Sequence, residues 1–324
     1  MTAPAASGAP LALGRRKLAD RLGDRALHAL TGAAALGAVL LVLLIAYELV
    51  KEAWPAISKF GLGFVTSREW DPNPLKFNFG ALDFIYGTVI TSFGALLLAG
   101  PLAIAIALFL SELAPRGIQA ALGTLVELLA AIPSVVIGLW GIFVLSPFLQ
   151  NHVDPALQSA LGWTPFFKGT PGLLGYFPAV LVLTIMTLPI VASVSRELFR
   201  SVPVDLKEAA LALGATRWEM IRGVVLPYTR GGLVAAVILG LGRAIGEAIA
   251  VLQVIGGTLG IHLSLFATGD TLASRIASQY QAAAYGIHVS ALVYLALVLL
   301  VISLVVNLAA QLIVRHFARV HRTA

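Results

Sequence analysis

The chain has 324 residues, of which 59% are hydrophobic and only 12% are charged, and its formal net charge is +6. Soluble domains carry roughly 25% charged residues, so a soluble fold of this length would lack polar side chains to cover its surface, and the composition indicates a membrane protein. There are no cysteines, which excludes disulfides, thiolate metal sites and cysteine nucleophiles.

Six apolar stretches are long enough to cross a bilayer, which takes roughly 20 helical residues. Several contain proline or glycine, which membrane helices tolerate because their neighbours satisfy the freed backbone groups. The predicted spans are 31–52, 84–110, 120–148, 173–195, 231–256 and 288–314. The expected fold is therefore an all-α integral membrane protein with six transmembrane helices.

Lysine and arginine gather on one side of these spans. An even number of spans puts both termini on that side, together with the second and fourth loops. Most of the 22 basic residues lie there, and positive charge stays on the cytoplasmic side of a membrane. We therefore expect cytoplasmic termini and external segments 53–83 and 257–286, and we assign the positive charge to orientation rather than to a nucleic-acid partner.

The segment before the first span is basic. No convincing small-residue cleavage site follows its apolar continuation, so we expect a retained span rather than a signal peptide. Residues 11–30 carry leucines among basic residues, which suits an amphipathic helix on the inner membrane surface. A disordered basic tail explains the same pattern equally well.

The loop 196–230 predicts a folded knob rather than a passive linker. A helix over 204–213 would stop at Gly214, which can take the left-handed conformation at a helix end. The run from Thr216 to Glu219 is a capping box that opens a second helix, and Pro227 is expected to close it.

The same loop resembles the EAA loop of bacterial ABC import permeases. The matching residues are Glu208, Ala209 and Ala210, then Gly214, Val224, Leu226 and Pro227. Val224 stands where isoleucine is usual. The resemblance implies a type I ABC importer permease fold, whose loop 200–227 docks into a cytoplasmic ATPase and passes its motion to the spans. An ordinary helix-turn-helix connector explains the caps but not this spacing.

The chain lacks the Gly-x-x-x-x-Gly-Lys-Ser/Thr loop that binds nucleotide phosphates, so it is expected to be a transport subunit and not an enzyme. No cofactor is expected in this chain, since ATP and Mg would be bound by the partner ATPase. The six histidines have no ligand-like spacing, so no metal site is predicted.

Arg243 and Glu247 place two charges deep in the predicted fifth span. A charge there costs from about 2.5 to well over 10 kcal/mol, depending on how it is estimated, and residues four apart share one face of a helix. The planar guanidinium matches phosphate oxygens. Our hypothesis is that Arg243 contacts a passing oxyanion and Glu247 neutralises it between transport events. A structural ion pair that locks two helices is the alternative.

The run around Arg243 also resembles the fifth span of PstC-type permeases of the bacterial phosphate importer, with Ala248 where threonine is usual. Further matches lie at 79–82, 85–88, 127–134 and 286–289, so the likeness extends over most of 78–316. It implies phosphate as the substrate and location in the bacterial inner membrane. The implied partners are a PstA-type companion permease, a PstB-type ATPase dimer and a PstS-type periplasmic phosphate-binding protein.

Further polar side chains in the spans are candidates for the substrate path. Glu127 either lines the path or hydrogen-bonds across helices, and we favour the second interpretation because the sequence identifies no partner for it. Ser134, Thr88 and Ser92 are candidate neutral donors, although hydroxyls in membrane helices more often bond a backbone carbonyl.

The predicted organisation follows from these segments. It comprises a cytoplasmic segment 1–30, the first helix and external segment 31–83, a permease domain 84–316 with the coupling loop 200–227, and a tail 317–324. The expected function is import of inorganic phosphate by alternating access. The alternatives are a permease for sulfate, molybdate or phosphonate, and an ion-coupled carrier or channel, which would need no docking loop.

Overall fold

The computed structural model describes residues 18–73, 75–283 and 286–320. The predicted segments 1–30 and 317–324, and the amphipathic helix expected over 11–30, lie partly outside these residues. The chain forms two units, Met1–Lys51 and Glu52–Ala324. Helix α1 (Leu18–Phe60) begins in the first and ends in the second. In the first unit its apolar side chains over 36–45 are exposed, as expected of a helix surrounded by lipid.

Six helical segments within the described residues are long and apolar enough to cross a membrane. They are Gly23–Phe60, Leu82–Leu113, Ser134–Leu161, Tyr176–Arg200, Arg217–Ile245 and Ile287–Leu312. Each overlaps one predicted span, so the all-α membrane fold with six spans is confirmed.

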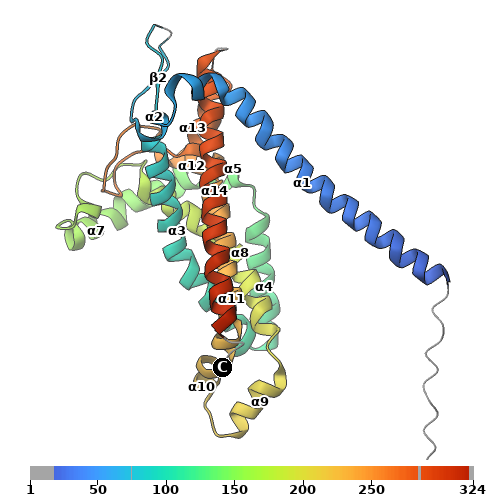
Figure 1. Ribbon diagram of the computed structural model, residues 1–324. Helices are drawn as coiled ribbons and strands as arrows, with labels where there is room; N and C mark the ends of the chain where they lie inside the picture. The colour runs from blue at the N-terminus through green and yellow to red at the C-terminus, as the bar shows by residue number, and fades with distance from the viewer. Residues whose placement is uncertain (1–17, 74, 284–285, 321–324) are drawn as a thin grey trace, which may run out of the picture. The chain divides into compact units, whose positions relative to one another are not determined.

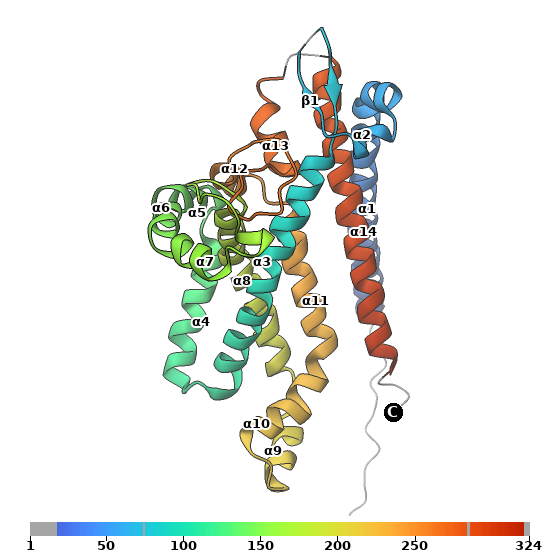
Figure 2. The same ribbon diagram turned by 90° about the vertical axis from the view of Figure 1, so that its left-hand side faces the viewer.

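Four long helices form the bundle of the second unit, namely α3 (Leu82–Leu108), α8 (Tyr176–Arg200), α11 (Leu226–Ile245) and α14 (Ile287–Val320). Helix α3 packs along α8, and α11 contacts α3, α8 and α14 (Figure 2). Small residues permit this close approach. A Cβ added at Gly240 of α11, for example, would lie 2.6 Å from the Val191 Cγ2 atom of α8.

The segment between α1 and α3 is part of the core. It contains α2 (Gly63–Thr66) and a hairpin of β1 (Trp70–Asp71) and β2 (Asn78–Phe79), paired antiparallel. The Trp70 ring packs edge-on against Phe79 and Phe84, at centroid distances of 4.8 and 5.1 Å. Its indole N–H donates to Gln279 of α13 (Leu272–Gln279) at 2.8 Å.

The third predicted span, 120–148, is wrong as a single helix. Helix α4 (Arg116–Ala131) ends before Ile132 and Pro133, and α5 (Ser134–Trp140) begins after them. A residue before proline avoids helical geometry, and proline supplies no N–H to continue the ladder. The chain continues through η2 (Gly141–Leu145), α6 (Ser146–Phe148), η3 (Leu149–Val153), α7 (Asp154–Leu161) and η4 (Pro165–Phe167). Figure 1 shows α7 extending to the side of α3.

The fifth predicted span, 231–256, is also broken. Helix α11 ends at Ile245, residues 246–248 are not helical, and α12 (Ile249–Ile255) follows. Gly256 stops α12 with a φ of 100°, in the left-handed region that favours glycine. The second halves of both broken spans meet, because α5 packs against α12.

The knob in the loop 196–230 is confirmed. Helix α9 (Val204–Ala212) is followed by Gly214 with a φ of 88°, and Thr216 and Glu219 form the capping box of α10 (Arg217–Met220). The expectation that Pro227 closes this second helix is wrong. The helix continues through the π-helical turn η5 (Ile221–Val225) into α11, since the wider turn accommodates the missing N–H of proline.

The knob lies at the opposite end of the second unit from the hairpin and α13, as Figure 1 and Figure 2 show. This agrees with the predicted separation of the loop 196–230 from the segments 53–83 and 257–286. Which end faces the cytoplasm stays a prediction.

Candidate functional site

Arg243 and Glu247 are in contact at the break of the fifth span. The Arg243 Nη2 atom lies 3.1 Å from Glu247 Oε2, and their side chains are 46% and 5% exposed. The predicted contact is therefore present, but the two residues do not lie on one helix, since α11 ends at Ile245. Both belong to a single stretch of chain, so the pair joins α11 to the break rather than locking two separate helices.

The second oxygen of Glu247 has another partner. Its Oε1 atom accepts a hydrogen bond from the Ala250 N–H, at 3.3 Å, in the first turn of α12. The buried carboxylate thus contacts a cation and a backbone donor, which together compensate its loss of water. Among the described residues, Glu247 is the ion-pair partner seen for Arg243, whose side chain stays half exposed, so part of its fork of N–H donors is accessible.

The crossing of α5 and α12 lies directly beside Ala250. A Cβ added at Gly138 would lie 2.8 Å from the Ala250 Cα atom and 3.0 Å from the Gln253 carboxamide. A glycine is required there because the two backbones approach so closely. The Oε1 atom of Gln253 is buried without a hydrogen-bond partner in the described structure.

Sequence reasoning missed Gln253. The sequence offers one signal for it: Gln253 is the single carboxamide in the otherwise apolar run 248–255, which directly follows the charge pair in the predicted span. A buried, unpaired polar group is costly, and each one calls for an explanation such as an absent ligand or water.

Glu127 lies on α4 and has a partner that the sequence did not reveal. Its Oε1 atom is 3.6 Å from the Nη1 atom of Arg196 on α8, and the Glu127 side chain is 68% exposed. Arg196 is mostly buried and occupies the space over Gly123, where an added Cβ would lie 2.4 Å from Nη1. The sequence predicts Arg196 at the start of the loop 196–230, but the structure places it in α8.

The hydroxyl candidates differ in their surroundings. The Thr88 hydroxyl donates to the Phe84 carbonyl at 2.8 Å and accepts from the Leu272 N–H at 3.0 Å, so it ties α3 to α13. Ser134 is half-buried and is the first residue of α5, directly after the break. Ser92 is buried, and its hydroxyl has no partner within the described residues.

The structure therefore brings together only some of the predicted path residues. Within the described part of the chain, no hydrogen bond or ion pair joins Arg243 or Glu247 to Glu127, Ser134 or Thr88. The site consists of the Arg243–Glu247 pair and the neighbouring crossing of α5 and α12.

The residues of the EAA-like loop divide into an exposed and a packed set. Glu208, Ala209 and Gly214 are exposed. Ala210, Val224 and Leu226 pack against the buried cluster around Phe199, and Pro227 is half-buried. Large apolar side chains of the knob also face outward, among them Val204, Leu213 and Trp218, which are 61%, 90% and 62% exposed. Exposed apolar side chains gathered on a polar knob are typical of an interaction surface.

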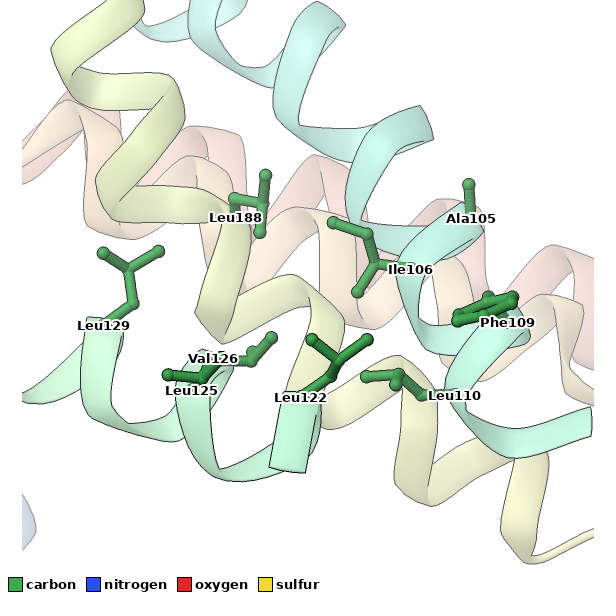
Figure 3. A pocket seen from close by; sticks show the side chains of 9 residues that line it. All are labelled: Ala105, Ile106, Phe109, Leu110, Leu122, Leu125, Val126, Leu129 and Leu188. Carbon is green, nitrogen blue, oxygen red and sulfur yellow. The ribbon is translucent and has the colours of Figure 1, made fainter. Parts of the chain in front are cut away.

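A pocket of about 540 Å³ lies between α3, α4 and α8. Figure 3 shows that its lining side chains are all hydrocarbon, from Ala105, Ile106, Phe109, Leu110, Leu122, Leu125, Val126, Leu129 and Leu188. A wall without donors or charges cannot compensate the desolvation of an anion. This pocket is therefore unsuited to the oxyanion that the sequence predicts as substrate.

Comparison with known proteins identifies the family of the chain. Residues 99–319 match the sequence model of the family described as binding-protein-dependent transport system inner membrane component. The phosphate transport system permease protein PstC of Mesorhizobium japonicum is 45% identical over 303 residues, which cover 92% of each chain. The protein of the same name from Pasteurella multocida is 43% identical, covering 85% of this chain and 86% of its own.

A solved structure shares the fold. A bacterial ABC transporter involved in the import of the acidic polysaccharide alginate has a chain that superposes with a TM-score of 0.61 at 20% identity. The match covers 92% of this chain and 99% of that one. The likeness at this identity concerns the arrangement of helices alone.

Proposed function

Because the chain belongs to the binding-protein-dependent transport system inner membrane components, and among them to the PstC-type permeases, we propose that it is a transmembrane subunit of an ATP-driven importer of inorganic phosphate. The observation that carries the chemistry is the half-exposed Arg243 held by the buried Glu247 at a break in a span. Charge inside a membrane is costly, so it is kept where it serves a path or a partner.

Arg243 is the proposed phosphate contact. Its guanidinium offers several N–H donors in one plane, which match two oxygens of an oxyanion. Glu247 would repel the same anion, so it acts as a competitor and not as a ligand. It compensates the arginine when the path is empty and keeps phosphate binding weak enough for release.

Gln253 is a further candidate on this path. Its carboxamide has one buried atom without a partner beside Gly138, and an amide can donate to a phosphate oxygen or accept from a protonated one. The breaks at Ile132–Pro133 and at 246–248 bring irregular backbone into the spans, which membrane proteins use where a path or a cavity is lined.

The knob is the proposed docking site for the ATPase. Glu208 and the exposed Leu213 and Trp218 offer a charged and an apolar contact on one protrusion. ATP and Mg would be bound by a PstB-type dimer on the cytoplasmic side of the inner membrane. A PstA-type companion would complete the path, and a PstS-type protein would deliver phosphate to the opposite end, where the hairpin and α13 lie.

The test is phosphate uptake by proteoliposomes that contain the complete complex. Arg243→Ala removes the oxyanion contact, so we expect uptake to fall about 100-fold or more, since a charge-assisted bidentate contact contributes roughly 3 kcal/mol. Glu247→Gln removes the competing charge, so we expect tighter phosphate retention and slower turnover.

Glu48→Gln is the matched control, because Glu48 lies in an exposed pair with Lys51 within α1 and belongs to neither the proposed path nor the knob, so its substitution should leave uptake unchanged. Normal phosphate uptake in both Arg243→Ala and Glu247→Gln would contradict the proposed path.

A further inference from the structure

A buried ion pair connects the knob to the end of α3. The Lys207 Nζ atom of α9 lies 2.6 Å from the Glu112 Oε1 atom, and the side chains are 17% and 8% exposed. The same ammonium donates to the Phe199 carbonyl of α8 at 3.1 Å. One cation therefore joins three helical segments at the base of the knob.

Five other ion pairs within the described residues differ from Lys207–Glu112 in burial or in the sequence distance between their partners. Arg243–Glu247 is local in sequence, and its arginine is 46% exposed. Lys51–Glu48 and Arg200–Glu197 are exposed pairs within one helix. Arg275–Asp270 is buried but local in sequence, and the Glu127 end of Arg196–Glu127 is exposed. Exposed pairs contribute little, whereas breaking a buried pair leaves a charge without compensation. The Lys207–Glu112 contact is thus the stiffer connection.

Neighbouring residues of α9 face different ways. Lys207 is half-buried and points toward Glu112, while Glu208 beside it is exposed. Glu112 lies in the π-helical turn η1 (Phe109–Leu113) that ends α3, and such turns occur frequently at functional sites in helices. A displacement of α9 at its exposed face would therefore reach α3 through one short ionic contact.

We propose that Lys207 and Glu112 are a positioning pair that passes movement of the docked knob to α3. The proposal rests on the proposed function, in which the knob docks on an ATPase. Neither Lys207 nor Glu112 belongs to the EAA-like motif. Through them the motion would reach α3, and then α8 and α11, which pack against α3. A stiff link transmits displacement, whereas a lost charge pair lets α9 move without α3.

The experiment measures phosphate taken up per ATP hydrolysed by proteoliposomes of the complete complex with its phosphate-loaded binding protein. We expect Glu112→Gln and Lys207→Met to keep ATP hydrolysis while the ratio of transport to hydrolysis falls about fivefold, as for other coupling substitutions. The double exchange Glu112→Lys with Lys207→Glu restores a pair of opposite charges. It should return the phosphate taken up per ATP hydrolysed to near the value of the unaltered complex.

Glu197→Gln serves as the control, because it breaks an exposed pair near the same end of α8 and should leave the ratio unchanged. An unaltered ratio in both single variants contradicts the proposal, and so does a double exchange that assembles and hydrolyses ATP without recovering the ratio. The pair would serve stability alone if the single variants assemble poorly, the double exchange restores assembly, and the complexes that do assemble all transport as much phosphate per ATP as the unaltered complex. That result would overturn the proposal. Failure of the unaltered complex to take up phosphate would instead refute the proposed function.

Discussion

At the residue scale, Gly138 shows how a missing side chain shapes the site. Its position against Ala250 and Gln253 leaves no room for a methyl group, since an added Cβ would approach the Ala250 backbone to 2.8 Å. The α12 backbone there is also held by the Glu247 carboxylate through the Ala250 N–H. Displacing α12 would therefore shift the partner of Arg243 as well.

The substitution Gly138→Ala tests this packing. We expect the free energy of unfolding to fall by about 1–3 kcal/mol, because overpacking forces the backbones apart, and phosphate uptake to fall with it. Gly117→Ala is the control, since Gly117 is helical and has no atom within 4 Å of an added Cβ. Thermal unfolding of the purified variants in detergent measures the change in stability, and the proteoliposome assay measures uptake. Equal melting temperatures of Gly138→Ala and Gly117→Ala would contradict the account of the crossing.

Contacts between site residues could be predicted from the sequence only where the two residues are close in the chain. Arg243 and Glu247 lie four positions apart, so their contact could be predicted whether or not the helix continued. The partners of Glu127 and Glu112 could not, because Arg196 and Lys207 come from distant segments that only the packing of α4, α8, α9 and α3 brings near. A buried carboxamide such as Gln253 carries no spacing signal at all.

At the scale of elements, the conformation of Gly214 decides whether the knob can form. Its φ of 88° lies in the left-handed region, where an L-residue costs about 1–2 kcal/mol. Helices α9 and α10 are short, so the turn between them has few other contacts to hold it. The orientation of Glu208 relative to Trp218 depends on this turn.

The substitution Gly214→Ala should therefore strain the turn and weaken ATPase binding about tenfold, which corresponds to roughly 1.4 kcal/mol. Gly223→Ala is the matched control, because Gly223 lies in η5 without a positive φ and with open space at its Cβ position. Co-purification of the ATPase with the membrane complex at graded ATPase concentrations measures the effect. Unchanged retention in Gly214→Ala would show that the turn does not set the docking surface.

Hydropathy predicted the number of spans but not their interruptions. Pro133 was visible in the sequence, yet proline also occurs inside the continuous helices α3 and α8, at Pro101 and Pro189. Whether a proline breaks a span depends on which neighbours satisfy the freed backbone groups, and that is a property of the packing. The break at 246–248 carries no proline, and within it the Glu247 carboxylate accepts a hydrogen bond from the Ala250 N–H of α12.

At the scale of the whole molecule, the division of the second unit into two ends could be predicted from charge and span number. The knob lies at one end and the hairpin with α13 at the other. The sequence also predicted the family through the EAA-like loop and the run at Arg243. The hairpin core around Trp70 could not be predicted, because its partners Phe84 and Gln279 lie on separate elements.

The measurement that tests the central claim most directly is ATP-dependent uptake by proteoliposomes that contain the complete complex, with ATP on the side of the knob and loaded binding protein on the other. We predict that radiolabelled phosphate accumulates only with ATP, and that excess sulfate or molybdate leaves its rate unchanged. Accumulation without ATP, or transport of sulfate or molybdate at a rate equal to that of phosphate, would contradict the account.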